Sequence, residues 1–247
     1  MTPSHPERID GAAADPAAPP RRIAIIGDGR MGHAVADLAA ARGWTVTARL
    51  DRRANKEGAG ITREGLGQPD VVIEFTQPSA AVANIRSAIA AGLPIVCGTS
   101  GWYDALPVVR ELVLHGNGSL FWAANFSVGA NLLNALAREA GRRLRDHPSF
   151  GAHIIETHHA AKRDAPSGTA IILEQFVREG RGKATPITSV RVGSVPGEHT
   201  LVIDGAFEQL TLRHEARDRR VFAEGALIAA DWLIGRTGIF TMTDLLP

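Results

Sequence analysis

The chain has little of several features that would narrow its function at once. It contains one cysteine, and its 27 basic and 26 acidic residues nearly cancel to a formal charge of +1. A single cysteine cannot form an internal disulfide. Cys97 lies in the apolar run at 93–97, so we expect a buried thiol at a strand end rather than a nucleophile. Without a concentrated basic surface, no nucleic-acid partner is expected.

Long hydrophobic runs are also missing. No segment approaches the roughly 18 consecutive apolar residues of a membrane span. The first twenty residues lack the basic start and apolar core of a secretory signal. We therefore expect a cytoplasmic protein with no membrane partner. Residues 1–20, rich in Ala and Pro without periodicity, predict a disordered tail.

After this tail, strand-like and helix-like runs alternate. The strand-like runs lie at 22–26, 45–50, 71–75, 94–97 and 119–123. The helix-like runs between them include 34–41 and 79–91. This alternation is typical of α/β proteins, and it predicts a Rossmann-type, doubly wound parallel sheet over residues 21–127.

A glycine cluster in this region has the spacing of a dinucleotide-binding turn. Gly27, Gly29 and Gly32 follow the first strand-like run and precede a helical run. Gly27 suits a tight turn, Gly29 the approach of a pyrophosphate, and Gly32 the contact of helix with strand. The start of the helix offers free N–H groups to phosphate. Asp51 follows about 20 residues later, where a ribose-binding acid is expected.

The neighbours of Asp51 leave the choice of dinucleotide open. Asp51 can accept hydrogen bonds from ribose hydroxyls, which favours NADH. Arg52 and Arg53 can pair with a ribose phosphate, which favours NADPH, or can be solvated loop charges. We therefore expect NADH and/or NADPH. Ligands of such sheets lie beyond the carboxyl ends of the strands, so the loops 27–32, 98–100 and 125–127 should line one crevice.

From residue 128 onward the pattern changes. A helix is expected to about residue 145, a strand at 153–156, and a helix at 169–179. Three strand-like runs at 189–195, 200–204 and 207–214 then follow without helices between them. This order predicts a second, α+β domain with an open mixed sheet over residues 128–219. The helical run at 221–233 should return to the first domain, which residues 220–247 complete.

The loop after the 153–156 strand carries the groups of a reductase that acts on an acidic substrate. His158 or His159 can donate a proton near neutral pH. Lys162 can hold a carboxylate, and backbone N–H groups and hydroxyls at Ser167 to Thr169 can cradle one at the start of the next helix. Asp164 fits a loop-stabilising acceptor better than a general base.

A metal centre is not expected in this loop. His153, His158 and His159 lie on or near one strand, where alternate residues face opposite sides. No cysteine or carboxylate cluster completes a set of ligands. The predicted site therefore contains no metal.

Residues 156–170 read ETHHAAKRDAPSGTA and resemble the signature of the 4-hydroxy-tetrahydrodipicolinate (dihydrodipicolinate) reductase family. AANFSVG at 123–129, EFTQP at 74–78, GTSG at 98–101 and PGEHT at 196–200 extend the resemblance over nearly all of the chain after the tail. The resemblance implies a reductase of the diaminopimelate route to lysine. It also implies a small dicarboxylate substrate and a homotetramer.

The resemblance further implies residue roles. His158 would be the general acid and Lys162 the second catalytic residue. His159, Ser167, Gly168 and Thr169 would bind the substrate. The implied cofactor-binding residues are Gly27, Asp28, Gly29, Arg30, Met31, Gly32, Asp51, Arg52, Phe75, Thr76, Gly98, Thr99, Ser100, Asn125, Phe126 and Ser127.

Two other hypotheses share the first domain. An amino-acid or semialdehyde-type dehydrogenase would lack the His-His and Ser-Gly-Thr pairing at this spacing. A non-catalytic dinucleotide sensor would have lost His158 or Lys162, and both are present. Relative to the common family form, the glycine loop is one residue shorter, and the stretches 51–70 and 180–196 are short. These departures bear on cofactor preference and assembly.

Overall fold

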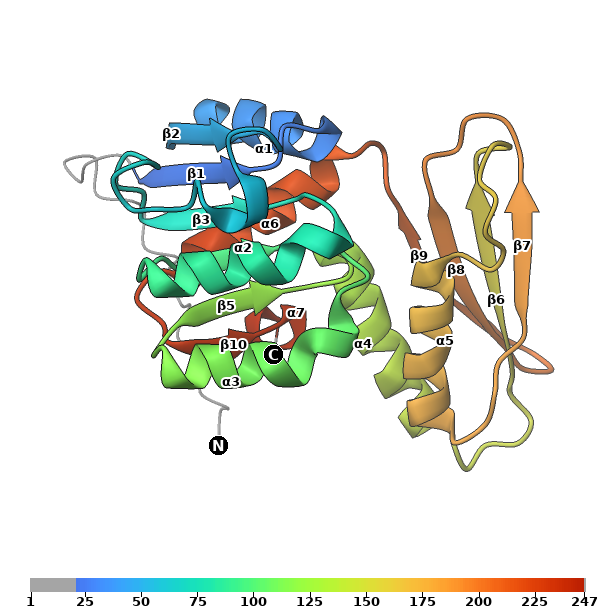
Figure 1. Cartoon of the computed structure of the whole chain (residues 1–247). Helices are drawn as coiled ribbons and strands as arrows, with labels where there is room; N and C mark the ends of the chain where they lie inside the picture. Colours follow the sequence, from blue (N-terminus) through green and yellow to red (C-terminus); the bar gives the residue numbers. More distant parts are fainter. Residues whose placement is uncertain (1–20, 247) are drawn as a thin grey trace, which may run out of the picture.

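A computed structural model describes residues 21–246, which form two units (Figure 1). The predicted tail at 1–20 lies outside the described residues. The first unit contains a six-stranded parallel sheet in the order β10-β5-β4-β3-β1-β2. Its strands are β1 (Arg22–Ile26), β2 (Thr45–Leu50), β3 (Val71–Glu74), β4 (Ile95–Cys97), β5 (Ser119–Trp122) and β10 (Gly238–Phe240).

Helices cover both faces of this sheet. The helices are α1 (Arg30–Ala41) and α6 (Arg220–Leu233) on one face, and α2 (Pro78–Ala90) and α3 (Leu106–His115) on the other. Side chains alternate along each strand, so Ile25 and Ile73 enter one apolar layer while Ile26 and Val72 enter the other. A sheet buried on both faces explains why these strands read as continuous apolar runs.

Strand order places a natural crevice at one edge of the sheet. β2 lies on one side of β1, and β3 lies on the other, so the chain changes direction across the sheet at the β1/β3 boundary. The loops that follow these two strands diverge there, which is the usual position of a ligand in an open α/β sheet. Short 3₁₀ turns, η1 (Lys56–Gly58) and η2 (Tyr103–Ala105), lie in the loops after β2 and β4.

The second unit pairs two helices with a four-stranded mixed sheet. Its elements are α4 (Val128–Arg143), β6 (Gly151–His158), α5 (Gly168–Arg181), β7 (Ile187–Arg191), β8 (Glu198–Asp204) and β9 (Gln209–Glu215). The sheet order is β7-β6-β8-β9, with β7 parallel to β6 and the other pairs antiparallel. Leu133 of α4 and Leu173 of α5 pack on Ile154 and Leu201. The helices lie on one face, and the other face of the sheet is left uncovered.

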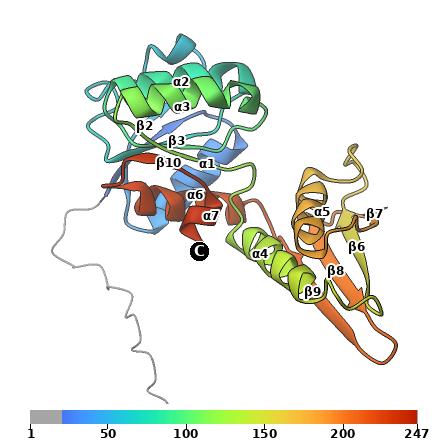
Figure 2. The same ribbon diagram turned by 90° about the horizontal axis from the view of Figure 1, so that it is seen from below.

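The two units are joined by α4 and by the chain between β9 and α6 (Figure 2). The starts of α4 and α5 come together at this junction, where the Asn125 Nδ2 donates to Thr169 Oγ1 at 3.3 Å. The Cα pairing of β6 with β8 sets Glu156 opposite His199 on the face that α4 and α5 cover. Every helix among residues 21–246 is too short or too polar to cross a membrane.

The predicted fold class is confirmed, but three elements were missed and the bounds of α1, β6 and β7 differ from those predicted. The return of α6 onto the first sheet is also as predicted. The pattern missed α3, β10 and α7 (Met242–Leu245). β10 has three residues and α7 four, too few for a periodic signal, whereas the ten-residue α3 was simply not recognised. β6 is longer than predicted, and His158 is its last residue rather than part of a loop.

Candidate active site

The β1–α1 turn has the geometry of a phosphate-binding loop. A Cβ on Gly27 would lie 2.0 Å from the Phe75 carbonyl oxygen, and one on Gly32 would lie 1.9 Å from the Gly27 carbonyl oxygen. A Cβ on Gly29 would meet nothing within 4 Å. The first two glycines therefore let backbone segments approach one another, whereas Gly29 leaves open space at the start of α1. A phosphate group fits that space and the free N–H groups beside it.

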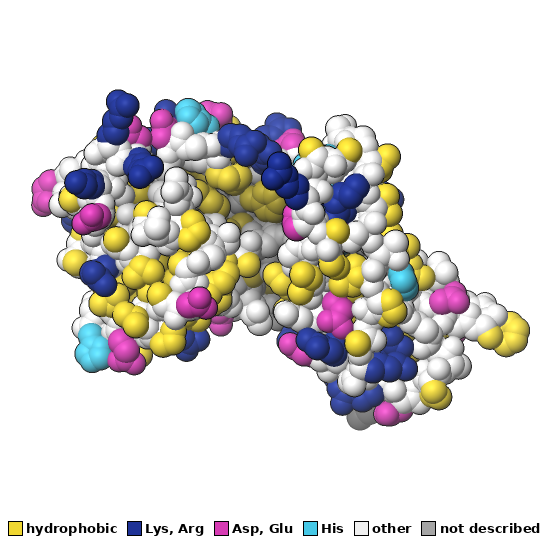
Figure 3. Space-filling model, turned by 45° about the vertical axis from the view of Figure 1, so that its right-hand side comes forward, with side chains coloured by type: hydrophobic (Ala, Val, Ile, Leu, Met, Phe, Trp, Pro, Cys, Tyr) yellow, Lys and Arg dark blue, Asp and Glu magenta, His cyan; other side chains and the backbone are white. Residues whose placement is uncertain are grey.

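A cleft of about 520 Å³ lies at the β1/β3 boundary. This volume is within the range of small-molecule sites. Its lining includes seven of the predicted cofactor residues, namely Gly27, Asp28, Gly29, Asp51, Arg52, Phe75 and Thr76. Space-filling views show a hollow between the two units with Lys and Arg side chains along its upper rim (Figure 3).

Asp51 uses one oxygen to shape its own loop. Its Oδ1 accepts hydrogen bonds from the backbone N–H groups of Arg53 and Ala54 at 2.9 and 2.8 Å. Within residues 21–246, its Oδ2 has no hydrogen-bond partner and is free to accept from a ligand. The Arg52 and Arg53 side chains are exposed and form no ion pair with another described residue. The carboxylate of Asp51 and the guanidinium groups of Arg52 and Arg53 are thus all free to contact a ligand at the same rim of the cleft.

A buried polar network supports the floor of this cleft. Glu74 is fully buried and accepts from Cys97 Sγ at 3.1 Å, from Asn84 Nδ2 at 3.2 Å and from the Thr76 hydroxyl. Burial raises the pKa of the Cys97 thiol, and Glu74 raises it further. The thiol is therefore protonated, and the predicted buried cysteine is confirmed. Thr99 Oγ1 accepts from the Thr76 N–H at 2.7 Å and so links the loops after β3 and β4.

Several predicted cofactor residues point their side chains away from the cleft. Phe126 is 2% exposed and packs in the core of the first unit. Ser127 is fully buried, and its hydroxyl accepts from the Ala130 N–H at 3.2 Å and contacts His214 Nε2 at 3.2 Å. Both can reach a cofactor only through their backbone. Sequence reasoning missed Gly225 of α6, where a Cβ would lie 1.7 Å from the Phe126 carbonyl oxygen.

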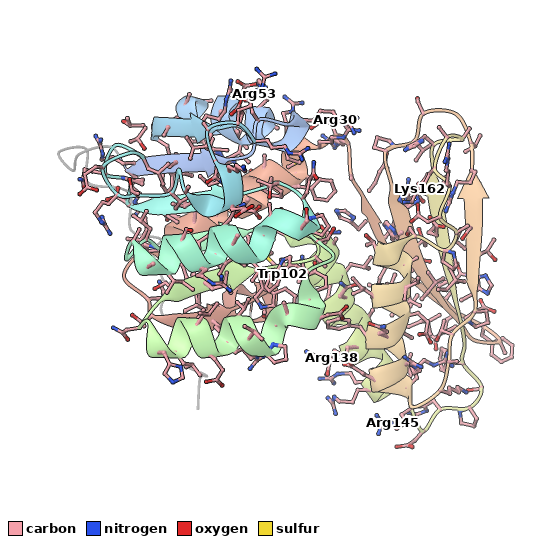
Figure 4. The ribbon with its side chains drawn as sticks, viewed as in Figure 1. Arg30, Arg53, Trp102, Arg138, Arg145 and Lys162 are labelled. Carbon is pink, nitrogen blue, oxygen red and sulfur yellow. The ribbon has the colours of Figure 1, made fainter. Side chains whose placement is uncertain are left out.

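The other predicted cofactor residues lie near the same edge. Arg30 is exposed at the start of α1, and Met31 packs partly against the core of the first unit. In Figure 4, Arg30 and Lys162 lie on the facing sides of the two units. A Cβ on Gly98 would lie 2.0 Å from the Phe75 ring, so the glycine lets this ring pack closely. Ser100 is exposed. Asn125 bridges to the second unit through Thr169.

In the second unit, a buried carboxylate orients one of the two predicted histidines. Glu156 and His158 are two residues apart on β6, so both face the α4/α5 side of the sheet. The Nδ1 of His158 bonds to Glu156 Oε2. Glu156 is 0% exposed and His158 is 8% exposed. With Nδ1 donating to the carboxylate, Nε2 is the atom left to exchange a proton with a substrate.

The other oxygen of Glu156 ties together two further elements. Its Oε1 accepts from Arg191 Nη2 at 2.7 Å and from the Ser167 N–H at 3.3 Å. Burial raises the pKa of a carboxyl group, but hydrogen bonds from Arg191, Ser189 and His158 outweigh it and lower the pKa of Glu156 to about 2. The group is therefore an anion at neutral pH. Arg191 was not singled out from sequence.

Lys162 is held on the loop that follows β6. Its Nζ donates to both carboxylate oxygens of Asp164, at 2.7 and 2.8 Å. This contact lowers the pKa of Asp164. The arrangement agrees with the predicted loop-stabilising role of Asp164. The carbonyl oxygen of Asp164 accepts from Arg191 Nη2 at 2.6 Å, so the loop is anchored to β7.

The environment of His158 favours its neutral form before a ligand binds. Burial lowers its pKa, and the charges of Lys162 and Arg191 lower it further, while Glu156 opposes them. A bound dianion would add negative charge beside the ring and raise the pKa again. The pKa of His158 therefore depends on the charge of whatever binds beside its ring.

The start of α5 leaves backbone N–H groups open beside these groups. Ser167 caps the helix by accepting from the Ala170 N–H at 3.2 Å. Gly168 is exposed, and a Cβ there would meet nothing within 4 Å. The N–H groups of Gly168 and Thr169 are thus available to a carboxylate. His159 directly follows β6, is half-buried and makes no side-chain hydrogen bond to another described residue.

Two further residues of this site, His199 and Gly197, were not predicted individually. His199 on β8 packs edge to face on His158 with ring centroids 5.2 Å apart, and its Nε2 lies 3.1 Å from Ser167 Oγ. Burial lowers the pKa of His199 to about 4, so it is neutral at pH 7. A Cβ on Gly197 would lie 3.1 Å from His158 Nε2, so this glycine keeps the nitrogen accessible. The PGEHT segment at 196–200 contained both residues.

The three histidines considered for metal binding do not converge. His153 faces the uncovered side of the sheet, where its Nε2 lies 2.7 Å from Thr188 Oγ1. A different set, Glu156, His158 and His199, brings potential ligand atoms within 4.8 Å of one another. Arg191 already neutralises the carboxylate of that set, and Lys162 adds a second cation. The electrostatics therefore suit an anionic ligand, and the metal-free site stays a prediction.

Family models match both halves of the chain. The model described as "Dihydrodipicolinate reductase, N-terminus" matches residues 21–126, and the one described as "Dihydrodipicolinate reductase, C-terminus" matches residues 129–246. Two curated relatives are both named 4-hydroxy-tetrahydrodipicolinate reductase. The one from Christiangramia forsetii is 33% identical over 91% of this chain and 97% of its own. The one from Gluconobacter oxydans is 38% identical over 91% and 96%.

A solved structure with the same architecture is described as dipicolinate-bound dihydrodipicolinate reductase from Paenisporosarcina sp. TG-14. It is 23% identical, covers 90% of this chain and 97% of its own, and has a TM-score of 0.78. At this identity the likeness establishes the fold of both units together.

Proposed function

The chain belongs to the dihydrodipicolinate reductase family, and we propose that it reduces 4-hydroxy-tetrahydrodipicolinate to tetrahydrodipicolinate with a reduced nicotinamide cofactor. The reaction is a step of diaminopimelate and lysine biosynthesis. The observation that carries the proposal is the match of family models to both units, together with a buried Glu156–His158 pair beside the open start of α5.

His158 is the proton donor in this proposal. Replacing the 4-hydroxyl group by hydrogen consumes one hydride and one proton and releases the hydroxyl as water. Nε2 of the protonated ring delivers that proton, while Nδ1 keeps its bond to Glu156. The anionic Glu156 stabilises the imidazolium that forms when the dianionic substrate is bound.

The start of α5 and Lys162 hold the substrate. A carboxylate of the substrate accepts from the N–H groups of Gly168 and Thr169, with the hydroxyls of Ser167 and Thr169 nearby. Lys162 turns from Asp164 to the substrate and supplies a cation. His159 is a further contact. The Paenisporosarcina relative is described as binding dipicolinate, a planar dicarboxylate, which supports this class of ligand.

The cleft of the first unit fits a nicotinamide dinucleotide. Gly29 leaves space for the pyrophosphate, the start of α1 supplies N–H groups, and Asp51 Oδ2 is free to accept from a ribose. The cofactor supplies a hydride when bound. Because Asp51 and Arg52 both line the cleft, we propose that NADH and NADPH are both used.

The uncovered face of the second sheet supports assembly into a homotetramer. Ile155 and Val190 are each 37% exposed on that face, and Phe207 is fully exposed at the β8–β9 hairpin tip. Apolar side chains in such positions gain stability when a second copy covers them. A molar mass of four chains by light scattering, lowered by Val190→Lys, is the expected result. A cytoplasmic location is proposed with it, checked by cell fractionation.

The activity is tested by following the near-ultraviolet absorbance of NADH and NADPH with substrate made in place from pyruvate and aspartate semialdehyde by a synthase. Substrate-dependent oxidation is expected with both cofactors. Oxidation without the substrate, or only with another acidic substrate, would point to a different dehydrogenase. Cofactor binding with no oxidation of either would indicate a dinucleotide sensor.

A further inference from the structure

We propose that Arg191 is a positioning residue for both His158 and Lys162. It is not itself the proton donor, and it lies outside the loop that carries Lys162. The inference rests on the proposed function, because it concerns the two side chains to which that function assigns the proton and the cation. The residue lies at the end of β7, and its role was not visible from sequence.

Arg191 reaches His158 through Glu156. One hydrogen of Nη2 is donated to Glu156 Oε1 at 2.7 Å, and Glu156 Oε2 then bonds to His158 Nδ1. Because Glu156 is 0% exposed, no water competes for its oxygens. An unpaired carboxylate in that position would be strongly destabilised by loss of hydration. The arginine therefore keeps Glu156 ionised and directed at Nδ1, which leaves Nε2 toward the substrate.

Arg191 reaches Lys162 through the backbone of Asp164. The second hydrogen of Nη2 is donated to the Asp164 carbonyl oxygen at 2.6 Å. The side chain of the same residue holds Lys162 Nζ. One guanidinium nitrogen therefore fixes both the carboxylate behind the histidine and the loop that carries the lysine. No other side chain among residues 21–246 hydrogen-bonds to both Glu156 and the loop 159–166.

The placement of Arg191 distinguishes this role from direct substrate binding. Nη1 donates to the neighbouring Val190 carbonyl at 2.7 Å, and Nε is buried without a partner. The hydrogens of Nη2 are both committed within the protein. Nη2 therefore has no hydrogen left for the substrate, and the effect of Arg191 on the reaction passes through Glu156 and Asp164.

The test replaces Arg191 by Met, which keeps an apolar stem of similar length but no donor. Misplacing a reacting group by about 1 Å costs roughly 10²-fold in rate. We expect kcat about 100-fold lower, a much smaller change in the KM for substrate, and unchanged affinity for NADH. Arg143→Met on α4, where the arginine pairs with Glu139 at the surface, is the matched control and should change none of these values.

A second readout does not depend on turnover. The groups that face His158 are Glu156 on β6, Arg191 on β7, His199 on β8 and Lys162 on the loop. Since the charge of Arg191 lowers the pKa of His158, its removal should raise that pKa in an NMR titration of the imidazole signals. His158→Gln assigns the signal. This readout remains decisive even if the substrate proves wrong, so failure of the proposed function and failure of the positioning role are distinguishable.

Arg191→Lys covers the case in which the Met variant does not fold. A lysine keeps the charge but not the planar fork, so it cannot hold the carboxylate and the carbonyl in the same geometry. It should lower kcat about tenfold and, because the charge is kept, shift the His158 titration less than Arg191→Met does. Wild-type kcat with an unmoved titration in either folded variant would overturn the proposal. A rise in KM with kcat and the titration unchanged would also overturn it, because Arg191 would then contact the substrate.

Discussion

The proposed cofactor cleft at the β1/β3 boundary and the proposed substrate pocket around Glu156 and His158 differ in the groups that form them. The cleft is made largely of backbone: Gly27 and Gly32 permit close contacts, Gly29 leaves space, and the start of α1 supplies N–H groups. The pocket depends on side chains that are buried and bonded to one another, with Glu156 0% exposed at its centre. A backbone site tolerates much variation around its glycines, whereas a side-chain network depends on every member.

The two sites also differ in the surroundings of their ionisable residues. The ionisable residues of the cleft, such as Asp51 and Arg52, are exposed to solvent, where interactions are screened. In the pocket, hydrogen bonds from Arg191, Ser189 and His158 outweigh burial and lower the pKa of Glu156 to about 2, whereas burial lowers the pKa of His199 to about 4. Three buried groups with shifted pKa values, Glu156, His158 and His199, therefore adjoin one another where proton transfer is proposed, as is common at catalytic centres.

The largest expected effect comes from a pair of variants that separates the chemical step from cofactor binding. His158→Ala should lower kcat about 10³-fold, the usual contribution of a positioned proton donor, with little change in NADH affinity. Asp51→Ala should weaken NADH binding and leave kcat at saturating cofactor nearly unchanged. Steady-state kinetics and fluorescence titration of NADH measure the two effects. Equal loss of cofactor affinity in both variants would contradict the division of roles between the units.

A second test uses the buried histidine of the pocket. His199 has a pKa of about 4 in the folded protein, below the ordinary 6.5. The unfolded chain therefore binds more protons between these values, and stability falls as pH falls from about 6.5 to about 4. The full contribution is about 3 kcal/mol. Urea unfolding at a series of pH values should show this slope.

His199→Asn should flatten that slope, because the variant has no group to titrate at this position. Replacement of the exposed His115 by Asn is the control and should leave the slope as in the wild type. A slope that persists in His199→Asn would mean that another group carries the acid sensitivity.

The backbone character of the cleft is tested by paired glycine variants. Gly29→Ala meets no protein atom, so it should leave the urea midpoint unchanged and weaken NADH binding about tenfold, the cost of an overpacked contact of about 1 to 3 kcal/mol. Gly32→Ala collides with the Gly27 carbonyl oxygen and should lower both stability and affinity. Unchanged NADH affinity in Gly29→Ala would place the pyrophosphate elsewhere.

The smallest effect is expected at the exposed charges of the cleft. Arg52→Ala should weaken NADPH binding by roughly five-fold or less, since exposed ion pairs contribute about 1 kcal/mol at most. NADH binding should change less, because NADH lacks the ribose phosphate. The difference should shrink at high salt, as measured by titration at two ionic strengths. An equal effect on both cofactors would show that Arg52 does not contact the phosphate.

Much of the fold could be predicted from local patterns. Alternating apolar runs and glycine spacing predicted the first sheet and the turn after β1, because these signals lie within single segments. β10 was missed since its three residues form a strand only by pairing with β5. The burial of the Phe126 and Ser127 side chains could not be predicted either. It depends on the contact of this loop with Gly225, which is distant in the sequence.

By itself, the sequence determined the glycine turn after β1, the two-unit order of elements and the nearness of His158 and Lys162 along the chain. These depend on residues that are neighbours along the chain. Only the tertiary structure decided which partners those residues have: Glu156 bonds to His158, Arg191 joins β7 to the loop, and His199 packs on the same ring from β8. Strand pairing brings these side chains together from separate segments, and burial then gives their charges and hydrogen bonds the strength that a solvated chain would not provide.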